Sequence, residues 1–228
     1  EIRQAAESGL QSVLARIHPS LRRWTPVFSD DFERAELGPN WQVGIGEWKI
    51  EKGRLICGFG QSEIYLKTAF AGYHRLEFEA ESLATQPCDL SPVIHAVDPT
   101  YTTGYLLQFG GEGNTQNRIL RAGSLLTPLG VPRPIKRGQT HHIVAELDGD
   151  IVRLSIDGET LVECRDPQPL QNPRNRRVGL CMWSEAAIDN LRVFTSTELP
   201  PLHRPTPPRR PINPARRWKM PPPFSADG

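Results

Sequence analysis

Short runs of alternating apolar and polar residues, separated by Gly, Asp and Asn turns, fill the chain between residues 25 and 196. Residues 76–80 and 105–109 show this alternation most clearly. Because successive side chains of a strand point to opposite faces, each run is expected to bury one face and wet the other. No helix-length period and no internal repeat occurs between Asp30 and Phe194, which argues against an α/β enzyme with a parallel sheet.

Two Asp-Gly pairs predict tight hairpins within this region. Asp148-Gly149 joins the runs 141–147 and 151–156, and Asp157-Gly158 leads into the run 160–164. Asp-Gly supplies the positive φ angles that tight hairpin turns require. The acidic segments that open and close the β region are expected to lie side by side. Residues 25–196 are therefore predicted to form one all-β, two-sheet antiparallel jelly-roll sandwich.

Composition sets limits on the partners of the chain. Its 228 residues carry a net charge of +1, so the total charge implies no nucleic-acid partner. No apolar run of about 18 residues occurs, so no membrane span is expected. The cysteines have no C-x-x-C spacing, which disfavours zinc ribbons, thioredoxin-type pairs and c-type haem. They could form disulfides or remain free as small buried hydrophobes; they are Cys57, Cys88, Cys164 and Cys181.

Both ends of the chain differ in composition from the sandwich. Residues 1–22 place apolar side chains at three- and four-residue steps, which predicts an amphipathic helix. Ten of the 22 prolines follow Leu199, so residues 197–228 are predicted to be an extended Pro/Arg-rich tail. We expect the helix and the tail to bind other protein subunits. The expected contacts of the tail are Arg209, Arg210, Arg216, Arg217 and Trp218.

The chain starts at Glu1 rather than Met. We expect that an export signal has been removed and that the protein is periplasmic or secreted. The alternative is an artificial starting point within a longer sequence.

The order of motifs along the sandwich resembles that of the concanavalin A-like jelly rolls, and in particular the bacterial domain family that contains the 3-keto-disaccharide hydrolases. The motifs are F-x-D-D-F, N-W, G-x-W-K-I-E-x-G-x-L, G-Y-x-x-Q, a long double Asp-Gly hairpin and I-D-N-L-R-V. They occupy residues 28–32, 40–41, 46–55, 104–108, 142–158 and 188–193.

The resemblance also implies where a hydrolase would carry charged groups. Hydrolases of this family tend to have an N-S-G-[IV]-x-x-R strand and a Y-E-x-Q-x-x-D strand. Here Ala96, Leu106 and Gly111 replace the arginine, the glutamate and the aspartate. Gln108, His95 and Ser91 remain, and of these only His95 could exchange a proton in general acid–base catalysis. We therefore expect no catalytic residues, with His95 and Gln108 as the candidates if the protein is an enzyme.

Glu77 and Glu79 provide a second possible enzymatic site. Retaining glycosidases use two carboxylates about 5 Å apart, and these glutamates have a suitable spacing on one predicted strand. An exposed polar face is the favoured interpretation, because alternating charges are the usual outer face of an antiparallel strand.

A structural calcium ion is a further prediction. Asp30, Asp31 and Asp189 lie where the first and last strands should meet, and calcium binds several carboxylate and carbonyl oxygens. The alternative is that an aspartate caps a turn and Asp189 pairs with a basic side chain.

Sugar sites combine aromatic platforms with a few amides. Trp183 is the best platform candidate, whereas Trp41 and Trp48 are expected in the core. Gln108, Asn114 and Gln116 supply amides at or near a Gly-rich loop. The sequence thus predicts a noncatalytic extracytoplasmic module, an accessory subunit of a larger assembly that can bind a glycan. The alternative is a sugar-acting hydrolase or lyase of the 3-keto-glycoside type.

Overall fold

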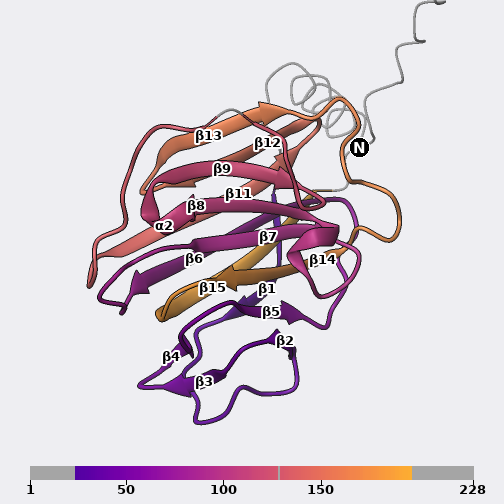
Figure 1. Ribbon diagram of the computed structural model, residues 1–228. Coiled ribbons are helices and arrows are strands. Elements are labelled where there is room, and N and C mark those ends of the chain that lie inside the picture. Colours follow the sequence, from indigo (N-terminus) through magenta and orange to yellow (C-terminus); the bar gives the residue numbers. More distant parts are fainter. Residues whose placement is uncertain (1–23, 128, 197–228) are drawn as a thin grey trace, which may run out of the picture.

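A computed structural model describes residues 24–127 and 129–196, which form two antiparallel sheets packed face to face (Figure 1). Sheet A runs in the order β13 (Glu159–Arg165), β12 (Ile151–Ile156), β11 (Thr140–Asp148), β6 (Tyr73–Ser82), β15 (Ala186–Ser196), β4 (Arg54–Cys57) and β3 (Trp48–Glu51), with β1 (Thr25–Asp30) also paired to β15.

Sheet B runs in the order β10 (Ser124–Leu125), β9 (Gln116–Arg121), β8 (Tyr105–Gly110), β7 (Leu90–Ala96), β14 (Arg177–Met182), β5 (Ser62–Leu66) and β2 (Trp41–Ile45). Two short helical turns adjoin this sheet, η2 (Tyr101–Thr103) before β8 and α2 (Gly111–Asn114) after it. The predicted all-β sandwich is confirmed.

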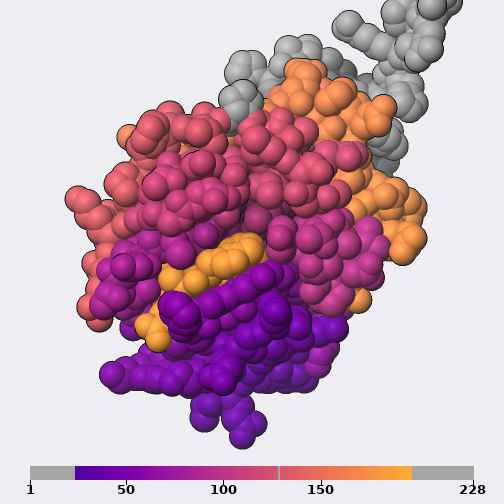
Figure 2. All heavy atoms as spheres, in the orientation of Figure 1, coloured from indigo at the N-terminus to yellow at the C-terminus, as the bar shows by residue number. Residues whose placement is uncertain are grey.

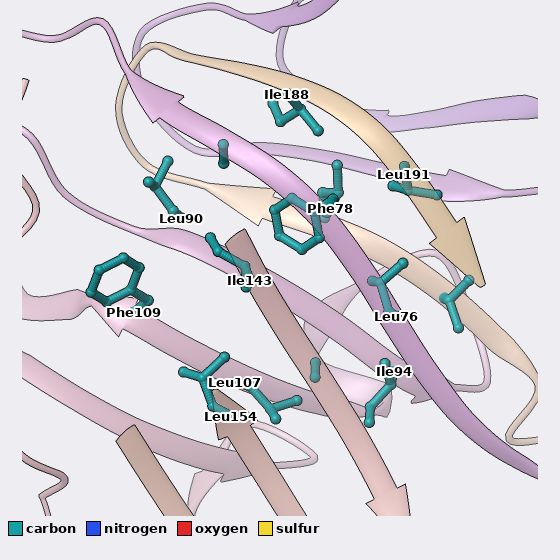
Figure 3. Close-up of a cluster of buried hydrophobic side chains, with 14 of the residues drawn as sticks. Leu76, Phe78, Leu90, Ile94, Leu107, Phe109, Ile143, Leu154, Ile188 and Leu191 are labelled. Carbon is teal, nitrogen blue, oxygen red and sulfur yellow. The ribbon is translucent and has the colours of Figure 1, made fainter. Parts of the chain in front are cut away.

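The core lies between the two sheets and is built from the predicted alternation. Leu76 and Phe78 of β6 face Leu107 and Phe109 of β8, and all four are fully buried or nearly so. Figure 3 shows these side chains interlocking with residues of the neighbouring strands. Trp41 is buried in this core as expected, whereas Trp48 is only partly buried at its border.

Both Asp-Gly pairs lie in tight hairpins. Asp148 pairs with Ile151, so the central residues of the first turn are Gly149 and Asp150, one position later than the sequence suggests. Asp157 and Gly158 link β12 directly to β13, and both have positive φ, 52° and 84°. The second turn therefore has the backbone conformation that Asp-Gly predicts.

The first and last strands are neighbours, as predicted. Thr25 lies opposite Thr195 and Asp30 lies opposite Leu191 in the antiparallel pair of β1 and β15. The predicted helix over residues 1–22 and the Pro/Arg-rich tail over 197–228, with Arg209, Arg210, Arg216, Arg217 and Trp218, lie outside the described residues.

Two further observations bear on the sequence predictions. The four cysteines are all free thiols, so of the two alternatives the structure shows unpaired cysteines, with Cys57 and Cys181 buried. Within residues 24–127 and 129–196, no helix has the length and apolar character needed to cross a membrane.

Candidate functional site

The outer face of sheet B, which points away from the core, carries an apolar row that crosses five strands. Tyr65 of β5 lies opposite Gly179 of β14, which in turn lies opposite Val93 of β7. The row continues through Leu106 of β8 and Leu120 of β9. A side chain at position 179 would collide with the ring of Tyr65, 2.4 Å from its added Cβ. Glycine there lets the tyrosine ring lie flat across β14.

A polar row runs beside the apolar one. Glu63 of β5 and Ser91 of β7 lie on either side of Cys181 of β14, and Gln108 of β8 pairs with Arg118 of β9. A row of apolar groups next to a row of hydrogen-bonding groups suits a sugar ring, which has apolar C–H faces and polar hydroxyl edges.

A hollow of about 400 Å³ opens where the two rows meet the end of β14. Figure 2 looks onto this side of the molecule, where the orange atoms of β14 form a strip between magenta and purple segments. The walls of the hollow combine aromatic, apolar and charged side chains. Its lining residues are Cys88, Asp89, Tyr101, Leu106, Gln108, Glu112, Gly113, Arg118, Leu120 and Trp183.

An aromatic pair forms one wall of the hollow. The rings of Tyr101 and Trp183 meet edge to face with centroids 5.6 Å apart. Glu63 holds this wall in place, because its carboxylate accepts the backbone N–H of Tyr101 at 2.9 Å and the hydroxyl of Tyr65 at 2.7 Å. Burial, together with the nearby Glu63 carboxylate, raises the pKa of Tyr65, which therefore remains a neutral donor.

A chain of hydrogen bonds forms the opposite wall. Asp89 accepts the amide N–H of Gln108 at 2.6 Å, and the amide oxygen of Gln108 accepts Nε–H of Arg118 at 2.6 Å. Arg118 in turn donates to Glu112 at 2.6 Å. Burial raises the pKa of Asp89 to about 7, although hydrogen bonds from Gln108 and Ser91 act in the opposite direction. Asp89 can therefore exist in both protonation states near neutral pH.

Solved structures with this arrangement of sheets include sugar-binding and sugar-cleaving proteins. A galectin-like protein of unknown function from Bacillus subtilis has a TM-score of 0.61 and 13% identity, covering 78% of this chain and 100% of that one. The carbohydrate-binding module CBM66 from Bacillus subtilis has a TM-score of 0.51 and 15% identity, covering 71% and 95%. The fold is a concanavalin A-like jelly roll.

An enzyme shares the same jelly roll. The GlcNAcα1-4Gal-releasing endo-β-galactosidase from Clostridium perfringens has a TM-score of 0.55 and 13% identity, and the match covers 76% of this chain and 63% of that one. No protein-family model matches the sequence, and no curated protein does. The resemblance to the 3-keto-disaccharide hydrolases therefore stays a prediction, whereas the jelly roll itself is confirmed.

Two of the four predicted ligand-binding residues line the hollow of the jelly roll. They are Gln108 and Trp183. Asn114 instead uses its side-chain amide in two hydrogen bonds of 2.8 Å, donating to the backbone oxygen of Ile135 and accepting its backbone N–H. Gln116 supports Arg118 through a 2.9 Å hydrogen bond and does not line the hollow. The sequence prediction missed Arg118, although Arg118 and Leu120 are two residues apart on β9 and therefore lie on the same face of the sheet.

Asp89 was also missed, and Tyr101 was one of several available aromatic residues but was not selected as a platform. Both precede a strand or lie in a turn, where alternation assigns no face, and no other sequence signal marks them.

His95 does not reach the outer face of sheet B, so its assignment as a candidate catalytic group is corrected. It is fully buried and stacks on His74, with ring centroids 3.9 Å apart, and its Nε2 accepts the backbone N–H of His74. Its positive φ of 55° turns the ring into the interior of the molecule. Burial lowers its pKa well below the ordinary value, and the neighbouring His74 adds to this effect. The side chain is therefore a neutral part of the packing.

Glu77 and Glu79 lie on the outer face of sheet A, on the opposite sheet from the hollow. Arg75 donates to Glu77 at 2.6 Å, Arg192 lies 3.2 Å from the same carboxylate, and Asn190 donates to Glu79 at 3.1 Å. Glu77 is thus nearly buried beneath its ion pairs, which differs from the exposed face favoured by the sequence, and Glu79 is bonded to an amide. Both lie on the sheet that faces away from the hollow.

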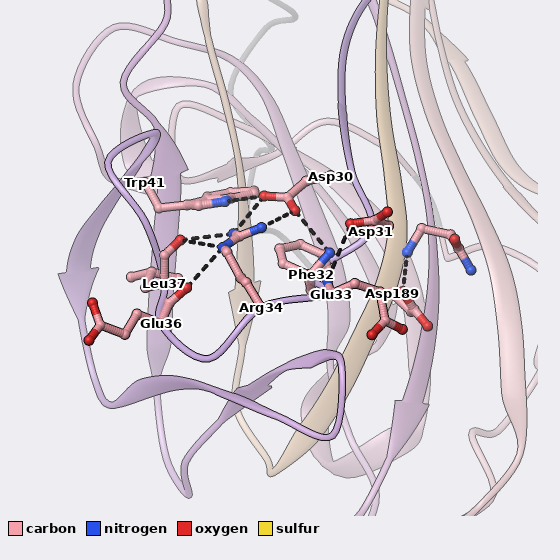
Figure 4. A network of polar contacts seen from close by, with 10 residues as sticks. Asp30, Asp31, Phe32, Glu33, Arg34, Glu36, Leu37, Trp41 and Asp189 are labelled. Carbon is pink, nitrogen blue, oxygen red and sulfur yellow. Dashed lines mark hydrogen bonds and ion pairs between the residues drawn. The ribbon is translucent and has the colours of Figure 1, made fainter.

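The predicted calcium ligands do not fit a calcium site. Figure 4 shows the carboxylate of Asp30 between the guanidinium of Arg34 and the indole of Trp41, bonded to both. These hydrogen bonds outweigh the effect of burial and lower the pKa of Asp30. Asp31 and Asp189 each accept a nearby backbone N–H. Across residues 24–127 and 129–196, no three His, Cys, Asp or Glu side chains are grouped to hold a metal ion.

Two larger hollows lie elsewhere. One of about 710 Å³ borders β3 and β4, and one of about 560 Å³ lies beside Asp30 and Arg34. The first combines the half-buried Trp48 with Phe59, which is 87% exposed, among side chains of both charges. The second is lined almost wholly by polar groups. The hollow on sheet B differs from both because an aromatic pair, an apolar floor and a fixed hydrogen-bonding chain converge in it.

Proposed function

We propose that this jelly roll is a noncatalytic glycan-binding module and that its site is the hollow on the outer face of sheet B. The observation that carries the proposal is the convergence there of the Tyr101–Trp183 pair with Gln108 and Arg118. An aromatic wall can stack against the C–H face of a sugar, and the side-chain amide and guanidinium can bind its hydroxyl groups. Sugar-binding modules among the similar structures support the same interpretation.

The apolar row supports the noncatalytic part of the proposal. Ala96 and Leu106 stand where the 3-keto-disaccharide hydrolases are expected to carry charged groups, and here both belong to the buried apolar cluster of this face. Apolar side chains therefore occupy the positions where a hydrolase would need charged groups to transfer protons.

Binding of a glycan array by the purified protein, followed by calorimetric titration of the best ligand, tests this proposal. Trp183→Ala should weaken binding about tenfold or more, because aromatic anchors dominate recognition surfaces. Trp48→Ala is the matched control, since Trp48 is also a half-buried aromatic but borders the hollow at β3 and β4. If Trp48→Ala abolished binding and Trp183→Ala did not, the site would lie at that other edge.

One observation favours a sugar-acting hydrolase as the second candidate. Asp89 is a buried carboxyl with a pKa of about 7 in the wall of a hollow, which is a common property of general acids. Turnover of aryl glycosides or 3-keto-glycosides that Asp89→Asn abolishes would establish this activity. We expect no turnover, because the other carboxylate lining the hollow, Glu112, is engaged by Arg118.

Further parts of the proposal are suggested by the sequence. We propose that the module is periplasmic or secreted and serves as an accessory subunit, with residues 1–22 and 197–228 binding its partner proteins. Arg209, Arg210, Arg216, Arg217 and Trp218 are the expected contacts. Copurification of the full chain with partner subunits, and its loss on truncation after Leu199, tests this role. A truncated chain that still assembles would contradict it.

A further inference from the structure

The loop between β8 and β9 has an unusual backbone conformation. Gly110, Glu112, Gly113 and Asn114 all have positive φ, at 76°, 50°, 64° and 69°. The conformation is natural for glycine but strained for a residue with a side chain such as glutamate. Asn114 pins the loop through its two hydrogen bonds with the backbone of Ile135. The loop is thus held in a shape that Glu112 does not itself favour.

This shape places the carboxylate of Glu112 on Arg118. Its oxygen lies 2.6 Å from Nη2 of Arg118, while Nε and Nη1 of the same guanidinium donate to Gln108 and Gln116. Among residues 24–127 and 129–196, Arg118 is the one cationic side chain that lines the hollow. Its orientation is therefore fixed by two amides, and its remaining edge meets an anion supplied by the chain itself.

The ion pair between Glu112 and Arg118 is easy to open. The Glu112 side chain is 55% exposed, and exposed ion pairs contribute little to stability because water and salt screen them. Arg118 would keep its bonds to both amides and stay aimed at the hollow, where its planar fork suits a carboxylate.

We propose that Glu112 occupies the place of a ligand carboxylate on Arg118, and that the hollow takes an acidic glycan, a saccharide whose ring carries a carboxylate. The ring would lie against Tyr101 and Trp183, and its carboxylate would replace that of Glu112. The inference rests on the proposed glycan-binding function and names its ligand class. The other carboxyl in the wall, Asp89, is separated from the guanidinium by Gln108, which bonds to both.

Titration calorimetry with two matched probes, an oligogalacturonate and the neutral oligogalactose of the same linkage, tests the proposal. The acidic probe should bind the full chain more tightly than the neutral one. Glu112→Gln should strengthen binding of the acidic probe about threefold or more, because it removes the competing anion, and should leave the neutral probe unchanged. Arg118→Gln should abolish the preference for the acidic probe, because it removes the cation that meets the ligand carboxylate, and Arg118→Lys should weaken the preference because lysine has no planar fork.

Glu159→Gln is the matched control, because Glu159 is also an exposed glutamate paired with an arginine, 3.3 Å from Arg133, but lies away from the hollow. It should change neither affinity. If both probes bind equally, or if Glu112→Gln weakens binding of the acidic probe, the acidic-glycan inference is overturned while glycan binding stands. If neither these probes nor any glycan of the array binds, the proposed function itself fails.

Discussion

The two outer faces of this sandwich use the same charged residues in different ways. On sheet A, arginines and glutamates from five neighbouring strands pair with one another. They form a charge ladder that consists of Arg192, Glu77, Arg75, Glu146, Arg153 and Glu163. On sheet B, Arg118 lines the hollow, is held by two amides and meets a glutamate from a loop. The first face is closed by its own pairing, whereas the second keeps a group that a ligand could reach.

The difference shows where a binding site can arise on a β-sandwich. A nearly buried carboxylate with two arginine partners, such as Glu146, is costly to separate from them, because it would leave unpaired charges with little access to water. An exposed carboxylate on a loop, such as Glu112, separates from its arginine more easily. The apolar row of sheet B adds a surface for a sugar ring, and the ladder of sheet A offers none.

The largest expected effect is a loss of stability when the charge ladder of sheet A is broken at Glu146. Glu146 is nearly buried and accepts hydrogen bonds from Arg75 and Arg153. Glu146→Gln should destabilise the protein by about 2–3 kcal/mol, because both arginines lose a charged partner. Urea unfolding measures the loss. Glu163→Gln, at the 43% exposed end of the ladder, should cost under about 1 kcal/mol. An effect of Glu146→Gln on glycan affinity would break the separation of the faces.

The next effect concerns pH and sheet B. The pKa of Asp89 is raised to about 7 from an ordinary value of 3.8, so between these values the folded state holds a proton that the unfolded state releases. The contribution of Asp89 to stability should therefore fall as pH rises through this window and level off above pH 7. Between pH 5.5 and 7, wild type should lose about 1.6 kcal/mol of stability relative to Asp89→Asn. Parallel pH profiles for the two proteins would refute the assignment.

A smaller effect should follow from loosening the aromatic wall. Glu63→Gln keeps the size of the side chain but weakens the hydrogen bonds from Tyr65 and Tyr101. Stability should drop by about 1 kcal/mol, since bonds to a charged acceptor are stronger than those to a neutral one. Glycan affinity should drop severalfold with it, because Tyr101 supports Trp183. Unchanged affinity in calorimetry would show that the wall does not depend on Glu63.

The smallest effect is expected at the surface of the β12–β13 hairpin. The Glu159 side chain is 84% exposed and its ion pair with Arg133 is long, at 3.3 Å. Glu159→Ala should change the free energy of unfolding by less than about 0.5 kcal/mol and leave glycan binding as it is. A larger loss of stability would mean that exposed pairs on this fold contribute more than their geometry suggests.

Alternation and turn chemistry made the fold predictable from the sequence. Leu76, Phe78 and Leu107 share the core because strand side chains alternate between faces. Asp157 and Gly158 form the predicted hairpin turn because both positions require positive φ. Both signals are local, so a single sequence carries them.

The sequence predicted only Gln108 and Trp183 of the residues that line the hollow, because the site depends on which sheet each strand joins. Nothing local distinguishes Glu79 on sheet A from Gln108 on sheet B. Alternation also fails at His95, whose left-handed backbone lets it point inward directly after the inward Ile94. Arg118 could have been placed beside Leu120, but its meeting with Glu112 needs a loop conformation that the sequence does not specify.

The pairing of β1 with β15 has a mechanical consequence. Thr25, at the start of the first strand, lies opposite Thr195, near the end of the last, so both ends of the sandwich leave the sheet at the same place. A force that pulls these two ends apart would load one pair of backbone hydrogen bonds at a time, starting at Thr25 and moving toward Asp30. The strands would peel open at low force, because their bonds would break in sequence and could not share the load.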